Sequence, residues 1–68
     1  MAIKYKIDVL AQLKEKGYSA YRLRKEKILG EASIQKLRKD ELVSWDNINT
    51  ICELLQCDIG DLLIYVQE

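Results

Sequence analysis

The chain has 68 residues, 49% of them hydrophobic, and its 11 Lys and Arg balance 11 Asp and Glu. Folding a chain this short buries only about 60% of its unfolded surface, so we expect no roomy internal cleft for a substrate or cofactor. No apolar run approaches the roughly 20 residues that span a bilayer, and no signal peptide is recognisable. We therefore expect residues 1–68 to form one mainly helical, soluble, cytoplasmic domain.

The first elements are a short strand and a helix. Residues 2–7 alternate apolar and polar side chains, a period of two that predicts a strand. Asp8 is a suitable cap for a helix that Gly17 would end. The apolar positions at helical spacing are Ile7, Leu10, Ala11 and Leu13.

Two short helices follow. Ser19 is a good N-cap for a helix to about Lys25, with Leu23 as its main buried residue. Ile28-Leu29-Gly30 interrupts the pattern, and Gly30 is placed to begin a third helix from Glu31 to about Lys39. In that helix Ile34 and Leu37 point inward, whereas Glu31, Gln35, Lys36, Arg38 and Lys39 point outward.

The last third of the chain predicts two more helices and a strand. Ser44 caps a fourth helix with the apolar stripe Trp45, Ile48, Ile51, Cys52 and Leu55. Asp58 and Asp61 have the spacing of a capping pair for a short fifth helix. The tail, residues 64–67, is rich in strand formers and is expected to pair with the N-terminal strand, within one chain or across a dimer.

The second and third helices have the pattern of a helix-turn-helix. Leu23, Leu29, Ile34 and Leu37 would lock the two helices at a steep angle. One face of the second helix of the pair then stays free, and a helix of this width fits the major groove of B-DNA.

Ordered matches to one family run from about residue 8 to residue 66. They are Gly17-Tyr18-Ser19, Leu23, Leu29, Ser33-Ile34-x-x-Leu37-Arg38, Ile51-Cys52-x-x-Leu55-x-Cys57 and Asp61-Leu62-Leu63-x-Tyr65-Val66. On these residues the chain resembles the Cro/CI-type (XRE family) helix-turn-helix domains, and more narrowly small stand-alone regulators of bacteria and phages. The resemblance implies an all-α, compact five-helix lambda-repressor-like bundle, here with short terminal β-strands, that usually binds DNA as a dimer.

The resemblance also implies which residues touch DNA. Its base-reading positions fall on Glu31, Ala32, Gln35 and Lys36, and its phosphate-contacting positions fall on Ser19, Ala20 and near Lys39. The full predicted interface is Ser19, Tyr21, Arg22, Glu31, Ala32, Ser33, Gln35, Lys36, Arg38 and Lys39. Three departures stand out: family members commonly have a small residue in place of Arg24, glycine in place of Ile28, and Asn-Gly in place of Lys39-Asp40.

The chemistry of these side chains leaves some roles open. Gln35 suits a bidentate contact to adenine, and Lys36 suits guanine or a phosphate. Glu31 either accepts from cytosine N4 or serves only as a favourable acid at a helix N-terminus. Tyr21 either reaches the DNA backbone or packs in the core or at the groove edge. Arg22, Arg24, Lys25 and Lys27 are phosphate contacts or solvated surface charges.

Charge is distributed unevenly along the chain. Residues 1–40 hold all 11 basic residues and five acids, a net charge of +6, whereas residues 41–68 hold six acids and no base. We expect this segregation to give the folded domain a basic face suited to an anionic polymer.

Other functions lack sequence support. Cys52 and Cys57 stand five apart in a chain without histidine, so buried thiols are favoured over a metal site. No motif arranges a catalytic group, and no Gly-rich phosphate loop is present. We predict no enzyme activity, no metal, no cofactor, no membrane and no small-molecule substrate.

The sequence thus predicts a double-stranded-DNA-binding regulator, a repressor that acts on an operator as a homodimer. The alternative is a protein-interaction module on the same fold that no longer reads DNA, which the neutral net charge and the acidic C-terminal part favour.

Overall fold

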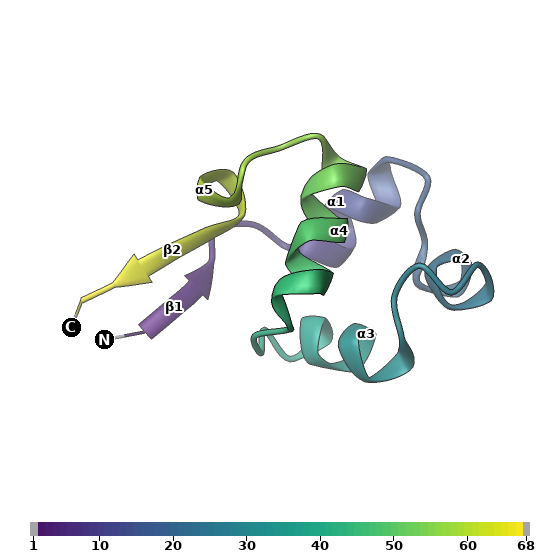
Figure 1. Cartoon of the computed structure of the whole chain (residues 1–68), viewed down its shortest axis with the longest axis horizontal. Coiled ribbons are helices and arrows are strands. Elements are labelled where there is room, and N and C mark those ends of the chain that lie inside the picture. Colours follow the sequence, from purple (N-terminus) through teal and green to yellow (C-terminus); the bar gives the residue numbers. More distant parts are fainter. Residues whose placement is uncertain (1, 68) are drawn as a thin grey trace.

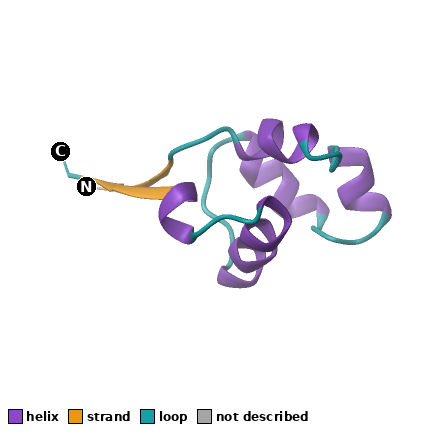
Figure 2. Cartoon of the chain, turned by 90° about the horizontal axis from the view of Figure 1, so that it is seen from above, coloured by secondary structure: helices purple, strands orange, loops and turns teal. Residues whose placement is uncertain are grey.

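The structure is a computed structural model that describes residues 2–67. Its elements run in chain order as β1 (Ala2–Tyr5), α1 (Val9–Glu15), α2 (Ala20–Lys25), α3 (Glu31–Arg38), α4 (Trp45–Leu55), α5 (Ile59–Leu62) and β2 (Leu63–Val66). The helices form a small bundle, and the two strands extend from it as an arm at the end of the molecule opposite α2 (Figures 1 and 2). The predicted helical bundle with short terminal strands is confirmed.

Three predicted N-caps hold the helix starts. The side chains of Asp8, Ser19 and Ser44 accept hydrogen bonds from the backbone N–H groups of Ala11, Arg22 and Asn47. Each satisfies one amide that the first helical turn leaves without a partner. At α5 the Asp61 carboxylate accepts the Asp58 N–H at 3.2 Å, so the predicted capping pair is also present.

The turn between α2 and α3 explains one departure from the family pattern. Its residue with left-handed backbone angles is Lys27, with φ at 55°. Ile28 follows with an ordinary backbone and a half-buried side chain, so this position does not require a glycine.

Nine aliphatic side chains form the buried core: Val9, Leu13, Leu23, Leu29, Ile34, Leu37, Ile48, Ile51 and Leu62. The four residues expected to lock the helix-turn-helix are all among them. Leu23 and Ile34 are fully buried, and Leu29 and Leu37 are 2% and 6% exposed. Helix α3 is therefore fixed to the bundle by its own apolar side.

The structure corrects two predicted faces. On α1 the buried residues are Val9 and Leu13, whereas Leu10 is half-buried and Ala11 is exposed. Trp45 does not continue the buried stripe of α4, because it is the first residue of that helix and is 73% exposed. The first turn of α4 thus extends beyond the core that Ile48 and Ile51 enter.

The strands pair within one chain. They run antiparallel with Ile3 opposite Tyr65 and Lys4 opposite Ile64. A two-stranded ribbon alone is marginally stable. Here Tyr5 Oη donates to the Glu41 carbonyl at 2.8 Å, and the backbone N–H of Lys6 donates to the Leu62 carbonyl at 2.9 Å. These bonds fasten the base of the ribbon to the bundle.

No helix within residues 2–67 has the length and apolar character needed to cross a membrane. Cys52 and Cys57 are free, half-buried thiols, and no three His, Cys, Asp or Glu residues gather in this part of the chain where an ion could bind.

Candidate nucleic-acid interface

Helix α3 has one buried side and one outward side. Ile34 and Leu37 anchor the helix to the core. Ala32, Gln35 and Lys36 lie on the opposite side of the helix and face outward. Ala32 and Lys36 are exposed, and Gln35 is half-buried beside them. No hydrogen bond or ion pair joins the Lys36 side chain to residues 2–67, which leaves its three N–H donors available to a ligand.

Glu31 lies at the start of α3 between two donors. Arg24 Nη1 of α2 donates to Glu31 Oε2 at 3.2 Å, and Gln35 Nε2 donates to Glu31 Oε1 at 3.0 Å. Arg24 Nε also donates to the Ala20 carbonyl at 3.4 Å. The guanidinium of Arg24 therefore spans the two helices of the helix-turn-helix.

The same contacts set the charge state of Glu31. The hydrogen bond from Gln35 lowers the pKa of the Glu31 carboxyl below its ordinary value, and the Arg24 and Arg38 guanidinium groups lower it further. A carboxylate is thus held ionised at the N-terminus of α3, where the helix dipole favours an anion.

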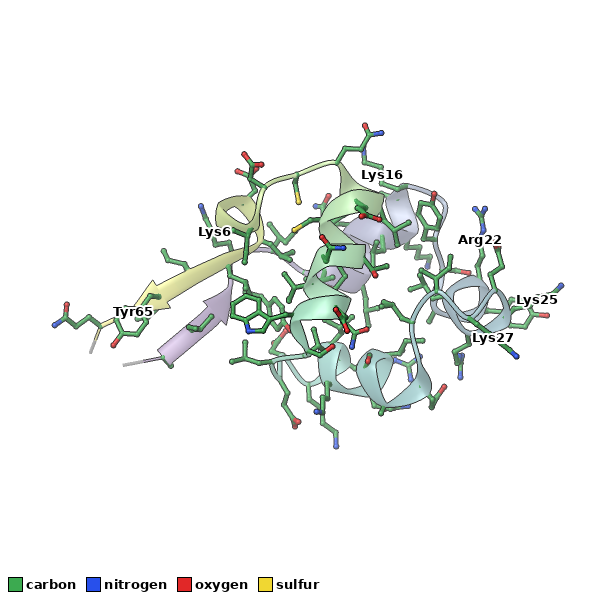
Figure 3. All side chains as sticks on the ribbon, viewed as in Figure 1. Lys6, Lys16, Arg22, Lys25, Lys27 and Tyr65 are labelled. Atoms are coloured by element: carbon green, nitrogen blue, oxygen red, sulfur yellow. The ribbon has the colours of Figure 1, made fainter. Side chains whose placement is uncertain are left out.

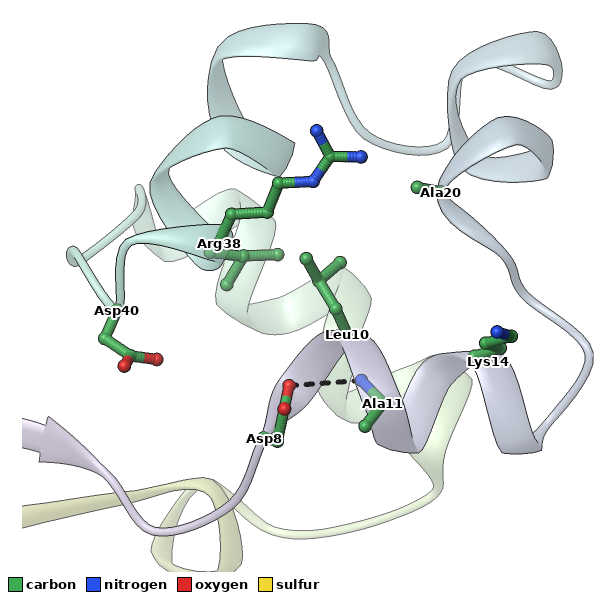
Figure 4. Close-up of a pocket in the computed structure, with 8 residues that line it drawn as sticks. Asp8, Leu10, Ala11, Lys14, Ala20, Arg38 and Asp40 are labelled. Atoms are coloured by element: carbon green, nitrogen blue, oxygen red, sulfur yellow. Dashed lines mark hydrogen bonds between the residues drawn. The ribbon is translucent and has the colours of Figure 1, made fainter.

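Two other predicted contacts on α3 lie in different surroundings. Ser33 Oγ accepts a hydrogen bond from Asn47 Nδ2, so this hydroxyl links α3 to α4. Arg38 extends into a hollow that Leu10 of α1 and Ala20 at the start of α2 also line (Figure 4). Lys39 caps the C-terminus of α3 and is exposed.

The predicted contacts on α2 differ in how constrained they are. Ser19 Oγ accepts the Arg22 N–H at 3.2 Å as the N-cap. Tyr21 is 67% exposed, and Lys25 Nζ lies 5.7 Å from the centre of its ring. Both side chains border the end of the molecule where α2 lies.

Arg22 is held within the protein. Its Nε donates to Glu26 Oε2 at 2.6 Å, and its Nη1 donates to the Gly17 carbonyl at 3.0 Å. Its guanidinium carbon lies 4.8 Å from the centre of the Tyr18 ring. Three partners therefore fix Arg22 near the start of α2.

Basic side chains gather around α2. Arg22, Lys25 and Lys27 project from the end of the molecule that lies opposite the ribbon (Figure 3). The acidic residues 46, 53, 58 and 61 belong to α4, to α5 and to the cap before α5. Apart from Lys4 and Lys6 near β1, the basic residues belong to α1, α2 and α3 or directly follow one of these helices.

The sequence did not predict two side-chain hydrogen bonds of this surface, the one between Arg24 and Glu31 and the one between Asn47 and Ser33. Arg24 and Glu31 are seven residues apart across a turn, and Ser33 and Asn47 are 14 apart. Each contact joins two different helices, so the period of a single helix does not relate its two residues. The unusual Arg24 was visible as a departure from the family, but its partner was not.

Comparison with known proteins identifies the family. The chain matches the family model of the Cro/C1-type HTH DNA-binding domain over residues 6–68. Searches of curated proteins and of solved structures gave no match. The match covers nearly the whole chain and includes the paired helices α2 and α3 with the exposed side of α3. The protein is therefore a member of the Cro/C1-type helix-turn-helix DNA-binding domains.

Proposed function

We propose that residues 1–68 act as a single unit, a sequence-specific repressor that reads double-stranded operator DNA in the cytoplasm as a homodimer. The observation that carries this proposal is the outward side of α3. Ala32, Gln35 and Lys36 share a side that the core does not use, and Ile34 and Leu37 fix the helix from behind. Major-groove readout requires a rigid helix whose outward side chains keep hydrogen-bond donors and acceptors available, as Lys36 and the second N–H and the Oε1 of Gln35 do here.

The basic side chains add affinity without sequence choice. Lys25, Lys36 and Lys39 are exposed, and phosphate contacts from such groups supply much of the binding free energy of DNA-binding proteins. The neutral net charge does not oppose this role, because residues 19–40, which contain α2 and α3, hold seven basic and three acidic residues. Repression then needs only occupancy of the operator.

An exposed apolar surface supports the homodimer. We define the ribbon-end surface as Ile3, Leu42, Trp45, Ile59 and Tyr65, each between 42% and 73% exposed. Its members line two shallow hollows that share Ile3, Trp45 and Leu63, so the surface is continuous. Together these side chains expose roughly 400–500 Å² of apolar area, near the upper limit for a monomer.

A second copy of the chain fits that surface by size. A standard interface buries about 800 Å² on each partner, of which a little over half is apolar. The ribbon-end surface supplies that apolar centre, with Trp45 as an aromatic anchor. It lies away from α2, so pairing through it leaves the basic ends free (Figure 1).

The same observation favours a second candidate function. A surface with an exposed tryptophan also fits a different protein, which would make the chain a protein-interaction module. The two functions differ in whether α3 discriminates between DNA sequences.

The proposed function is tested by selecting bound duplexes from a random DNA pool. The wild type is expected to enrich a two-fold-related site with half-sites about 34–36 Å apart, one turn of the double helix. Lys36→Ala is expected to lose enrichment, because it removes a donor from the reading face. Lys16→Ala is the matched control, since Lys16 lies on the other side of the molecule from α3 (Figure 3). Enrichment of no sequence by the wild type would contradict the proposal.

A further inference from the structure

Three polar side chains form a connected unit on the outward side of the helix-turn-helix. Each oxygen of the Glu31 carboxylate accepts from a different donor, Oε2 from Arg24 at 3.2 Å and Oε1 from Gln35 at 3.0 Å. The unit joins α2 to the first turn and a half of α3. Arg24 is itself held at a second point, the Ala20 carbonyl at 3.4 Å.

The carboxylate dictates how the Gln35 amide is turned. An ionised carboxylate only accepts hydrogen bonds, so Gln35 must present its NH₂ group to Glu31 and not its carbonyl. One N–H is used in that bond. The other N–H and Oε1 remain as an adjacent donor and acceptor, the pair that matches N7 and N6–H of adenine in the major groove.

We infer that Arg24 and Glu31 are positioning residues that hold the Gln35 amide ready to read one base pair, with Glu31 contacting no base of its own. This inference rests on the proposed DNA-binding function. A glutamine that is already ordered loses less rotamer freedom when it binds, and an amide held in one orientation rejects bases that need the opposite one. Arg24, where the family commonly has a small residue, thereby acquires a role in specificity.

The inference differs measurably from direct readout by Glu31. If Glu31 accepted a hydrogen bond from cytosine N4, its removal would relax a base pair different from the one that Gln35 reads. If Glu31 only orients Gln35, both variants relax the same base pair.

The experiment compares DNA selection by the wild type and by Arg24→Ala, Glu31→Ala and Gln35→Ala. Gln35→Ala is expected to reduce the preference at one base pair by about tenfold or more. Arg24→Ala and Glu31→Ala are expected to reduce the preference at that same base pair by about threefold to tenfold. Arg22→Ala is the matched control. It removes an equal charge from the same helix, and its partners Glu26 and Gly17 lie outside α3. It should weaken all sequences alike.

A second measurement detects the hydrogen bonds among Arg24, Glu31 and Gln35 in the protein without DNA. The pKa of Glu31, read from its side-chain carbon shift by NMR, is expected to rise toward the ordinary glutamate value in both Gln35→Ala and Arg24→Ala. Circular dichroism of each variant confirms folding, which these substitutions of exposed or half-buried side chains should leave intact.

The possible results distinguish a failure of the positioning role of Arg24 and Glu31 from a failure of the proposed DNA-binding function. A Glu31 pKa unchanged in Arg24→Ala, or a Glu31→Ala variant that relaxes a base pair of its own, would overturn the inference while DNA reading stands. A wild type without preference at any base pair would overturn the proposed function, and the positioning role with it.

Discussion

Three residues other than glycine, among those that the structure describes, have left-handed backbone angles, and each lies at or just beyond a helix end. They are Lys27, Asp40 and Gln56, with φ between 54° and 58°. A β-carbon in this region approaches the following carbonyl oxygen and costs about 1–2 kcal/mol. These three left-handed residues destabilise the fold by that amount, but they end the helices and reverse the chain within a few residues.

Gln56 gives the cleanest test at this scale, because it is an exposed C-cap outside the candidate interface. Gln56→Gly is expected to raise the free energy of unfolding by about 0.5–1 kcal/mol, since glycine adopts the left-handed conformation without steric cost. Urea denaturation measures the change. Glu53→Gly, within α4, is the control and should lower stability by about 1 kcal/mol. A loss of stability in Gln56→Gly would show that the left-handed backbone of Gln56 is not strained.

For single residues, the sequence predicts which side of a helix a side chain lies on but not its hydrogen-bond partner in another helix. The outward position of Lys36 follows from helical period alone, because Ile34 and Leu37 fix the buried side. The bonds from Arg24 to Glu31 and from Asn47 to Ser33 do not, since they depend on how three helices dock. Long polar side chains choose among many rotamers, and tertiary neighbours decide which one is occupied.

For the helices, N-cap residues correctly predicted where three of them start, whereas the apolar period wrongly predicted some of the buried residues. Asp8, Ser19 and Ser44 cap helices because their side chains bond to amides within the same turn, a contact that needs no partner from elsewhere. Trp45 fits the apolar period of α4 but lies beyond the edge of the core. Periodicity identifies a face and not the point at which the neighbouring helices stop covering it.

The ribbon depends on contacts that sequence pattern could not specify. Alternation predicted the N-terminal strand and a run of strand formers predicted the C-terminal strand, but neither pattern specified whether the strands pair within one chain or between two. The bond from Tyr5 Oη to the Glu41 carbonyl at 2.8 Å ties the end of β1 to the segment between α3 and α4. Such a bond contributes about 1 kcal/mol to stability.

Tyr5 therefore carries a pH-dependent prediction. Burial raises the pKa of Tyr5 above its ordinary value, and the Asp40 carboxylate acts in the same direction. Because folding favours the neutral phenol, this stabilisation is fully present below about pH 10 and is lost as the pH rises through the folded-state pKa. Wild type and Tyr5→Phe should differ by about 1 kcal/mol near pH 7, and the difference should shrink above about pH 10.

Thermal unfolding followed by circular dichroism across that pH range provides the measurement. Tyr65→Phe is the control, because its side chain is 58% exposed and makes no hydrogen bond within residues 2–67. A Tyr5→Phe difference that is independent of pH would contradict the assigned contact.

At the scale of the whole molecule, the elongated shape separates two surfaces. The long axis measures 38 Å, with α2 at one end and the ribbon at the other (Figure 1). One end carries basic side chains and the other carries the ribbon-end surface. This separation permits a dimer that presents two reading helices at once, and two linked half-sites raise affinity through effective concentration.

Dimer formation can be followed through the sole tryptophan of the chain. Trp45 is 73% exposed, so its fluorescence emission should shift to shorter wavelength as the protein concentration rises and the ribbon-end surface is buried. Light scattering should show the mass of two chains for the wild type and of one chain for Trp45→Ala. Tyr21→Ala, an equally exposed aromatic at the other end, should remain dimeric. A wild type with the mass of one chain, with or without DNA, would contradict the dimer.

Readout of DNA sequence by α3 can be measured by salt-dependent fluorescence anisotropy on the selected site. Binding is expected in the nanomolar range and should weaken about a hundredfold or more between 50 and 200 mM salt, because Lys and Arg displace counterions from the phosphates. A scrambled duplex should bind at least about a thousandfold more weakly at equal salt. Equal affinity for the selected and scrambled duplexes, unchanged in Lys36→Ala, would contradict the account.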